Sequence, residues 1–153
     1  MNKPWIGWVL TLCLSFWGCS DGSGCPNGVC ECQGSSCVCP SSGDCLLNCA
    51  AGCNLQCAGS GDCRFSCGST CSTSCTGSGH CNLDVGPSAT VSCTGSGGCD
   101  VVCHGNCTVR CPGSGKCSAV CAPETPGCVI DMTQCSGTVN RCSSGVFLCH
   151  ANC

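Results

Sequence analysis

Between residues 39 and 121 the chain alternates apolar and polar positions over short stretches. In residues 45–49 (CLLNC) and 63–67 (CRFSC), the first, third and fifth positions hold cysteine or an apolar residue. Residues 53–57 (CNLQC) and 107–111 (CTVRC) repeat the pattern. Alternation with a period of two is typical of a half-buried β-strand. The pattern therefore predicts pairs of short strands, joined by small or turn-favouring residues such as Ala-Ala-Gly.

This two-strand unit recurs with an 18-residue period. Gly-Ser-Gly triplets begin at Gly59, Gly77, Gly95 and Gly113, always one period after the one before. Aligned in rows of 18, the cysteines fall into columns, and a full row reads Cys-x5-Cys-x3-Cys-x3-Cys-x3-Cys. A fixed period of this size indicates a solenoid, in which stacked repeats bury a face that one repeat cannot bury alone. We expect an all-β fold, a flattened parallel β-solenoid of 18-residue coils stapled by internal disulfides.

The row that lacks two cysteines indicates how the others pair. In residues 75–99, Val85 and Ala89 stand where the other rows have cysteine. Folding a row over its short turn makes these two positions face each other, so their joint replacement favours bonds within one coil. The predicted pairs are Cys45–Cys57, Cys49–Cys53, Cys63–Cys75, Cys67–Cys71, Cys81–Cys93, Cys99–Cys111 and Cys103–Cys107. Bonds between successive coils, such as Cys49 to Cys67, are the alternative. Bonds within a coil require the two strands to come close together at both edges of the coil. A disulfide holds Cα atoms about 5.5–6 Å apart, whereas facing sheets usually lie about 10 Å apart.

Residues 1–20 have the features of a targeting segment. Lys3 precedes an apolar stretch over residues 5–17 that is too short to span about 30 Å of hydrocarbon, which predicts a signal peptide in residues 1–20. Gly18-Cys19 is similar to the end of a bacterial lipobox. That resemblance implies a lipoprotein signal in residues 1–18 and a lipidated Cys19, whereas ordinary signal peptidase cleavage after Ser20 is the alternative.

The regions beside the regular repeat are predicted from their spacing. Residues 21–38 are expected to form an N-terminal cysteine-rich cap with two short strands, and residues 39–121 the repeat solenoid. Residues 122–153 are expected to form degenerate coils and a C-terminal cap, in which Val129 and Phe147 take cysteine positions.

Composition supports export and covalent stabilisation. The chain has 28 cysteines in 153 residues, a level typical of disulfide scaffolds. All three tryptophans lie before Gly18 and tyrosine is absent, so the remaining chain cannot bury enough to offset backbone ordering without cross-links. Disulfides persist in oxidising compartments, so we expect an extracellular or cell-envelope location. The net charge of −3 argues against nucleic acid and anionic membranes as partners, which leaves membrane contact only through an anchor at Cys19.

Three resemblances bear on function. The leader and the Cys-x-Gly-Ser-Gly-x-Cys repeat over residues 39–121 resemble cysteine-rich repeat proteins and lipoproteins of bacterial cell surfaces, which implies exposure outside the cytoplasm. The Cys-Glu-Cys and Cys-Val-Cys clusters in residues 30–39 are similar to those of metallothioneins, whose thiolates bind zinc or copper. The outward Ser and Thr residues of the second strands resemble the Thr-x-Thr ladders of insect antifreeze solenoids, although Asn54 and Arg110 interrupt them.

Residues typical of catalysis do not group in the sequence. His80, His104 and His150 stand at unrelated positions of the repeat, and no serine elbow or phosphate loop accompanies them. The residue that closes each glycine loop also varies, so it predicts a turn and not a ligand site. We therefore expect no enzyme, cofactor or metal, and a secreted or surface-anchored structural or interaction protein. An exported thiolate metal binder and an ice-binding solenoid are the alternative hypotheses.

Overall fold

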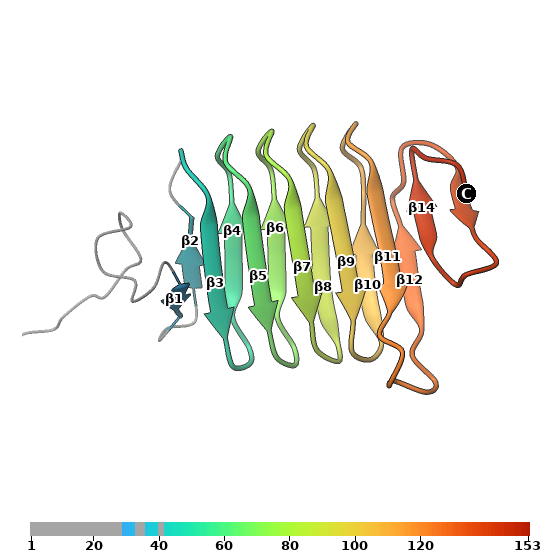
Figure 1. The fold of residues 1–153 in the computed structure, drawn as a ribbon, viewed down its shortest axis with the longest axis horizontal. Helices are drawn as coiled ribbons and strands as arrows, with labels where there is room; N and C mark the ends of the chain where they lie inside the picture. Colours follow the sequence, from blue (N-terminus) through green and yellow to red (C-terminus); the bar gives the residue numbers. More distant parts are fainter. Residues whose placement is uncertain (1–28, 33–35, 40–41) are drawn as a thin grey trace, which may run out of the picture.

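The computed structural model describes residues 29–32, 36–39 and 42–153 of the chain. The predicted signal peptide, Cys19 and residues 21–28 of the predicted cap lie outside these ranges. Within them the regular elements are all strands, which stand side by side along the long axis of the molecule (Figure 1). No described element is a helix with the length and apolar character needed to cross a lipid bilayer.

The strands form two sheets, and the chain passes from one to the other in each coil. The eight-stranded sheet has the order β1-β3-β5-β7-β9-β11-β14-β13, and the six-stranded sheet has the order β12-β10-β8-β6-β4-β2. The first contains β1 (Val29–Glu31), β3 (Cys45–Cys49), β5 (Cys63–Cys67), β7 (Cys81–Val85), β9 (Cys99–Cys103), β11 (Cys117–Cys121), β13 (Val139–Arg141) and β14 (Phe147–Cys149). The second contains β2 (Ser36–Val38), β4 (Asn54–Cys57), β6 (Ser72–Cys75), β8 (Ala89–Cys93), β10 (Cys107–Arg110) and β12 (Ile130–Thr133).

The pairing register follows the 18-residue period. Cys63 lies beside Cys45 on one side and Cys81 on the other, and all pairs among β3, β5, β7, β9 and β11 are parallel. The second strands β4, β6, β8 and β10 pair in the same way. The predicted parallel β-solenoid with internal disulfides is therefore confirmed.

The core is a narrow file of apolar side chains between two cysteine columns. Along β3 and β5 buried and exposed residues alternate, as the pattern of cysteine, aliphatic and polar residues predicts. The central positions of the two sheets hold the largest fully buried side chains, among them Phe65, Leu47 and Leu55. In most coils each sheet contributes one such residue, so little apolar area is available per residue.

The Gly-Ser-Gly loops are explained by close stacking of backbone on backbone. A Cβ atom on Gly97 would lie 1.9 Å from the carbonyl oxygen of Gly79, and one on Gly79 would lie 2.0 Å from that of Gly61. No side chain fits at these distances. Glycine recurs once in every coil at this position because each loop rests directly on the loop of the preceding coil.

The N-terminal strands extend the solenoid. Strand β1 pairs in parallel with β3, and β2 pairs in parallel with β4. The sequence predicted a separate two-stranded cap here, but the two strands lie in different sheets. Their short alternating pattern fits the repeat, so they add one coil at the end of the stack.

The C-terminal region departs from the predicted register. A longer loop precedes β12, so Ile130 lies beside Cys107, and Val129 is 60 % exposed. Strand β14 then runs antiparallel to β11 and places Cys149, not Phe147, beside Cys117. The expected cysteine positions of Val129 and Phe147 are therefore wrong, because the longer loop and the reversed strand direction shift the register.

One buried hydroxyl in the apolar file gives a testable prediction. Thr73 is 1 % exposed, and its Oγ1 has no hydrogen-bond partner. Thr73→Val keeps the side-chain shape and removes a desolvated polar group, so we expect the free energy of unfolding to rise by about 1 kcal/mol. Denaturant unfolding under non-reducing conditions measures this. The matched control is Val91→Thr at the neighbouring position of β8, which should lower stability by a similar amount. A less stable Thr73→Val protein would contradict the explanation.

Candidate functional site

The main chemical feature of the described residues is a set of twelve disulfides. Most of them lie in two columns along the solenoid, one at the short turns and one at the glycine loops. Within the regular coils the bonded Cα atoms are 5.9–6.5 Å apart. This separation is well below the roughly 10 Å usual between facing sheets, so both edges are narrow.

At the short turns the disulfides have the expected partners. Cys49 is bonded to Cys53, and the corresponding bonds in two other coils are Cys67–Cys71 and Cys103–Cys107. Each closes a turn of three residues that joins the two sheets. Further bonds at the ends of this column are Cys32–Cys37 and Cys121–Cys128.

At the glycine loops the expected partners are wrong. The predicted pairs Cys45–Cys57, Cys63–Cys75, Cys81–Cys93 and Cys99–Cys111 are replaced by bonds that join the last cysteine of one coil to the first of the next. These bonds are Cys39–Cys45, Cys57–Cys63, Cys75–Cys81, Cys93–Cys99 and Cys111–Cys117. The alternative of bonding Cys49 to Cys67 is not formed either.

The physical reason lies in the path of the chain. The glycine loop carries the chain up to the next coil, so the cysteines on its two sides meet in the same way as those beside the short turn. Pairing across each loop also uses all ten cysteines of this column, whereas pairing within coils would leave Cys39 and Cys117 without partners. Each of these disulfides therefore closes the loop between two consecutive strands.

The missing disulfide at the short turns is replaced by two buried apolar residues. Val85 lies between Cys67 and Cys103 in the sheet register, and Ala89 lies beside Cys107. Their exposed fractions are 0 % and 1 %. The two side chains thus fill the space of the disulfide and interrupt this column in the middle of the solenoid.

Restoring the missing bond should stabilise the protein. In the double variant Val85→Cys/Ala89→Cys we expect an additional disulfide and a gain of about 2 kcal/mol in unfolding free energy, from closure of a five-residue loop. Intact mass and denaturant unfolding measure the two effects. The single variant Val85→Cys is the control, since it should carry a free thiol and gain nothing. Two unpaired thiols in the double variant would show that the two positions do not face each other.

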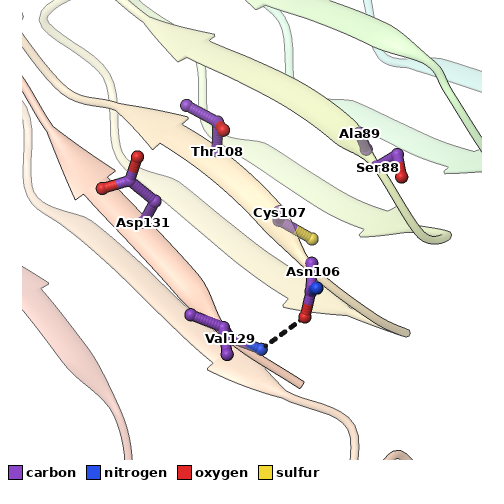
Figure 2. A pocket seen from close by; sticks show the side chains of 7 residues that line it. All are labelled: Ser88, Ala89, Asn106, Cys107, Thr108, Val129 and Asp131. Carbon is purple, nitrogen blue, oxygen red and sulfur yellow. Dashed lines mark hydrogen bonds between the residues drawn. The ribbon is translucent and has the colours of Figure 1, made fainter. Parts of the chain in front are cut away.

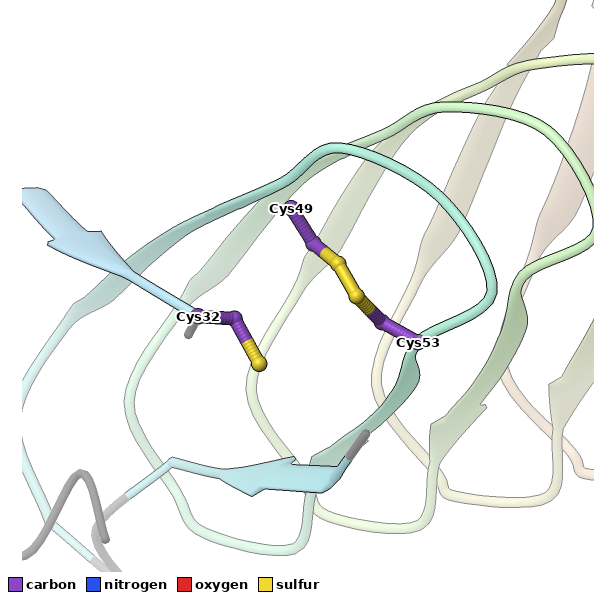
Figure 3. Close-up of side chains that lie close together, drawn as sticks. All are labelled: Cys32, Cys49 and Cys53. Carbon is purple, nitrogen blue, oxygen red and sulfur yellow. A yellow bond between two sulfur atoms is a disulfide. The ribbon is translucent and has the colours of Figure 1, made fainter. Parts of the chain in front are cut away.

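Four groups of sulfur and imidazole atoms have the spacing of soft-metal ligands. Within each group the ligand atoms lie within 4.8 Å of one another, and the groups are Cys32/Cys49/Cys53, Cys57/Cys63/Cys81, Cys93/Cys111/Cys117 and Cys135/Cys149/His150. Figure 3 shows the first of them, with the Cys32 sulfur beside the Cys49–Cys53 bond. Every cysteine in these groups forms a disulfide. Because thiolates, not disulfides, bind zinc or copper, these groups become ligand sets only after reduction.

The outer face of the eight-stranded sheet carries histidine–carboxylate pairs that the sequence did not suggest. His80 Nε2 lies 2.8 Å from Asp100 Oδ2, and His104 Nε2 lies 2.7 Å from Asp84 Oδ1. A Cβ on Gly98 would lie 2.3 Å from the His80 ring, so glycine at this position leaves room for the imidazole to reach the next coil. The members of each pair are 20 residues apart in sequence, close to the 18-residue period. Aligning the repeats in rows of 18 is therefore the sequence signal that could have placed them near each other.

These pairs lack the arrangement needed for nucleophilic catalysis. The Ser118 hydroxyl donates to Asp100, not to the His80 imidazole, so the imidazole is not placed to take its proton. Ser136 Oγ and His150 Nε2 are 2.8 Å apart, but the same hydroxyl also donates to the carbonyl oxygen of Gly113. The side chains of the two pairs are 35–58 % exposed, so each contact contributes little to stability.

A shallow depression of about 430 Å³ lies on the outer face of the six-stranded sheet, near the ends of β8, β10 and β12 (Figure 2). Its lining residues are Ser88, Ala89, Asn106, Cys107, Thr108, Val129 and Asp131. Asn106 Oδ1 accepts a hydrogen bond of 2.9 Å from the backbone N–H of Val129, which joins the two sides of the depression. The polar groups present could hydrogen-bond a small molecule, but the lining contains no histidine and its cysteine is in a disulfide.

The same sheet carries the outward hydroxyl residues that resemble an antifreeze ladder. Ser72 lies beside Thr90, and Thr90 lies beside Thr108, so the predicted file exists as neighbouring side chains. Asn54 precedes Ser72 in this file and Asp131 follows Thr108, whereas Arg110 lies in the second outward file, beside Ser92. The run of hydroxyl groups therefore extends over only the three central coils.

The function of this protein has to be inferred from its own sequence and structure. The disulfide columns, the stacked glycine loops and the polar outer faces are the observations on which a function must rest. No protein-family model matches the chain, and no curated protein or solved structure is significantly similar to it.

Proposed function

We propose that this protein is an exported, non-catalytic structural or interaction protein, a rod stiffened by disulfides outside the cytoplasm. The observation that carries the proposal is the set of twelve disulfides along the described coils, ten of which close loops between consecutive strands. Disulfides of this density are typical of extracellular proteins, because cytosolic reductants keep thiols reduced. The apolar leader and Cys19 support secretion or lipid anchoring in the same way.

The distribution of side chains supports a structural or interaction role over catalysis. Functional groups of the outer faces are spread along the coils, and the depression described above is shallow. Solenoids offer long, regular surfaces that suit binding to extended partners. Among the described residues, exposed large apolar side chains are few and lie near the two ends of the stack, namely Val38, Leu46, Val129 and Val139, so the central faces are suited to polar contacts.

Intact mass of the protein taken from its native compartment tests this proposal. Under denaturing conditions the mass should be lower than that of the reduced chain by two hydrogen atoms for each disulfide, with no bound metal under native conditions. The mass of the N-terminal peptide reports whether Cys19 is lipidated. Thiols at full mass together with bound zinc or copper would overturn the proposal and favour the exported metal binder, for which the three-sulfur groups would be the sites.

A further inference from the structure

At the glycine-loop edge, some neighbouring disulfides lie within reach of each other. The Sγ atoms of Cys57, Cys63 and Cys81 are within 4.8 Å of one another, although Cys81 is bonded to Cys75. A second group has the same form, with Cys93 beside the Cys111–Cys117 bond. The six cysteines of these groups are 6 % exposed or less. Each group thus holds a complete disulfide and one sulfur of an adjacent disulfide, shielded from solvent.

We propose that these two groups are thiol–disulfide exchange sites, through which a broken disulfide passes from one coil to the next. A small dithiol that attacks Cys75, which at 6 % is the most exposed of the four cysteines, reduces the Cys75–Cys81 bond, is itself oxidised and leaves thiols on both cysteines. The Cys81 thiolate then attacks Sγ of Cys63, the Cys63–Cys81 bond forms, the Cys57–Cys63 bond breaks, and Cys57 leaves as thiolate. One sulfur–sulfur bond is lost for each one gained, so the exchange step needs no further oxidant or reductant.

The backbone already has the geometry of the exchanged state. Cys63 and Cys81 are direct partners in the parallel register of β5 and β7. Adjacent strands lie about 4.8 Å apart, which is within the range of about 4.4–6.8 Å that disulfides span between Cα atoms. The bond can therefore move between coils by side-chain rotation, while the strands keep their positions.

Burial directs the thiolate to its neighbour. External thiols reach Cys57 and Cys63 poorly, since each is 2 % exposed. The Cys81 sulfur, by contrast, is held next to both by the sheet, and a fixed neighbour has a high effective concentration. At the short-turn edge one group of the same form, Cys32 beside the Cys49–Cys53 bond, lies near the N-terminal end of the stack, and farther along Val85 and Ala89 replace the central disulfide and interrupt the column.

The variant Cys75→Ser tests the proposal in the intact oxidised protein, because it leaves a single thiol on Cys81 without any added reductant. After incubation near the ordinary thiol pKa of about 8.5, the protein is denatured, labelled with iodoacetamide and mapped by peptide mass spectrometry. Because the exchange interconverts two states whose bonds are of one type, Cys57–Cys63 and Cys63–Cys81, roughly half of the label is expected on each of Cys81 and Cys57. Label on Cys81 alone would overturn the proposal.

The variant Cys103→Ser is the matched control. It leaves a thiol on Cys107, which belongs to none of the sulfur groups found among the described residues, so the label should stay on Cys107. Label spread over several cysteines in this control would show exchange through unfolded chains and would also overturn the proposal.

If Cys75→Ser fails to fold, Cys99→Ser repeats the test at the second group, with the thiol on Cys93 beside Cys111–Cys117. Label confined to Cys93 would count against the exchange site as directly as label confined to Cys81. The test depends on the disulfides and not on export, so a negative result leaves the proposed cellular role unaffected.

Discussion

Complete reduction of the disulfides is expected to unfold the solenoid. Closing a loop of five to eight residues contributes about 2 kcal/mol on the chain-entropy model, and ten such bonds are present among the described residues. Their sum exceeds the net stability of about 5–15 kcal/mol that is usual for a domain. The apolar file cannot replace them, since most coils bury only one large side chain per sheet.

Circular dichroism and limited proteolysis measure this effect. The oxidised protein should show a strand spectrum and resist protease, and both properties should be lost after reduction with a phosphine and alkylation of the thiols. Oxidised protein incubated with the alkylating agent alone is the control. A reduced, alkylated chain that keeps its strand signal would mean that backbone stacking, not the disulfides, holds the coils together.

The second large effect is expected from a single methyl group in a glycine loop. Gly97→Ala places a Cβ 1.9 Å from the carbonyl oxygen of Gly79. The two loops cannot separate freely, because the strands on both sides of them are paired with each other, β6 with β8 and β7 with β9. We expect a loss of about 3 kcal/mol in unfolding free energy, at the upper end of overpacking effects. Denaturant unfolding under non-reducing conditions measures it.

Ser96→Ala is the matched control, because Ser96 precedes Gly97 in the same loop and is exposed. This change should alter stability by no more than about 0.5 kcal/mol. Equal stabilities for Gly97→Ala and Ser96→Ala would show that the loops are not in backbone contact, and the explanation of the Gly-Ser-Gly period would have to be abandoned.

The repeating part of the fold can be predicted from the pattern of amino acids alone. Inward residues recur at a period of two within strands and with an 18-residue period between coils, so Cys45, Cys63 and Cys81 fall into one column of the aligned sequence. The replacement of Val85 and Ala89 as a pair likewise indicates that these positions face each other. Such patterns are visible in the chain because every coil makes the same contacts with its neighbours.

Which neighbouring cysteines bond depends on the path of the chain in three dimensions. Cys57 could bond either to Cys45 in its own coil or to Cys63 in the next, and it bonds to Cys63. The partner depends on how the glycine loop carries the chain to the next coil, and the spacing of the cysteines does not specify that path. The contact of His80 with Asp100 depends in turn on the space above Gly98, and the position of Ile130 depends on a longer loop outside the repeat. These features were missed because they arise from the connections between coils, whereas the periodic pattern records only what each coil buries.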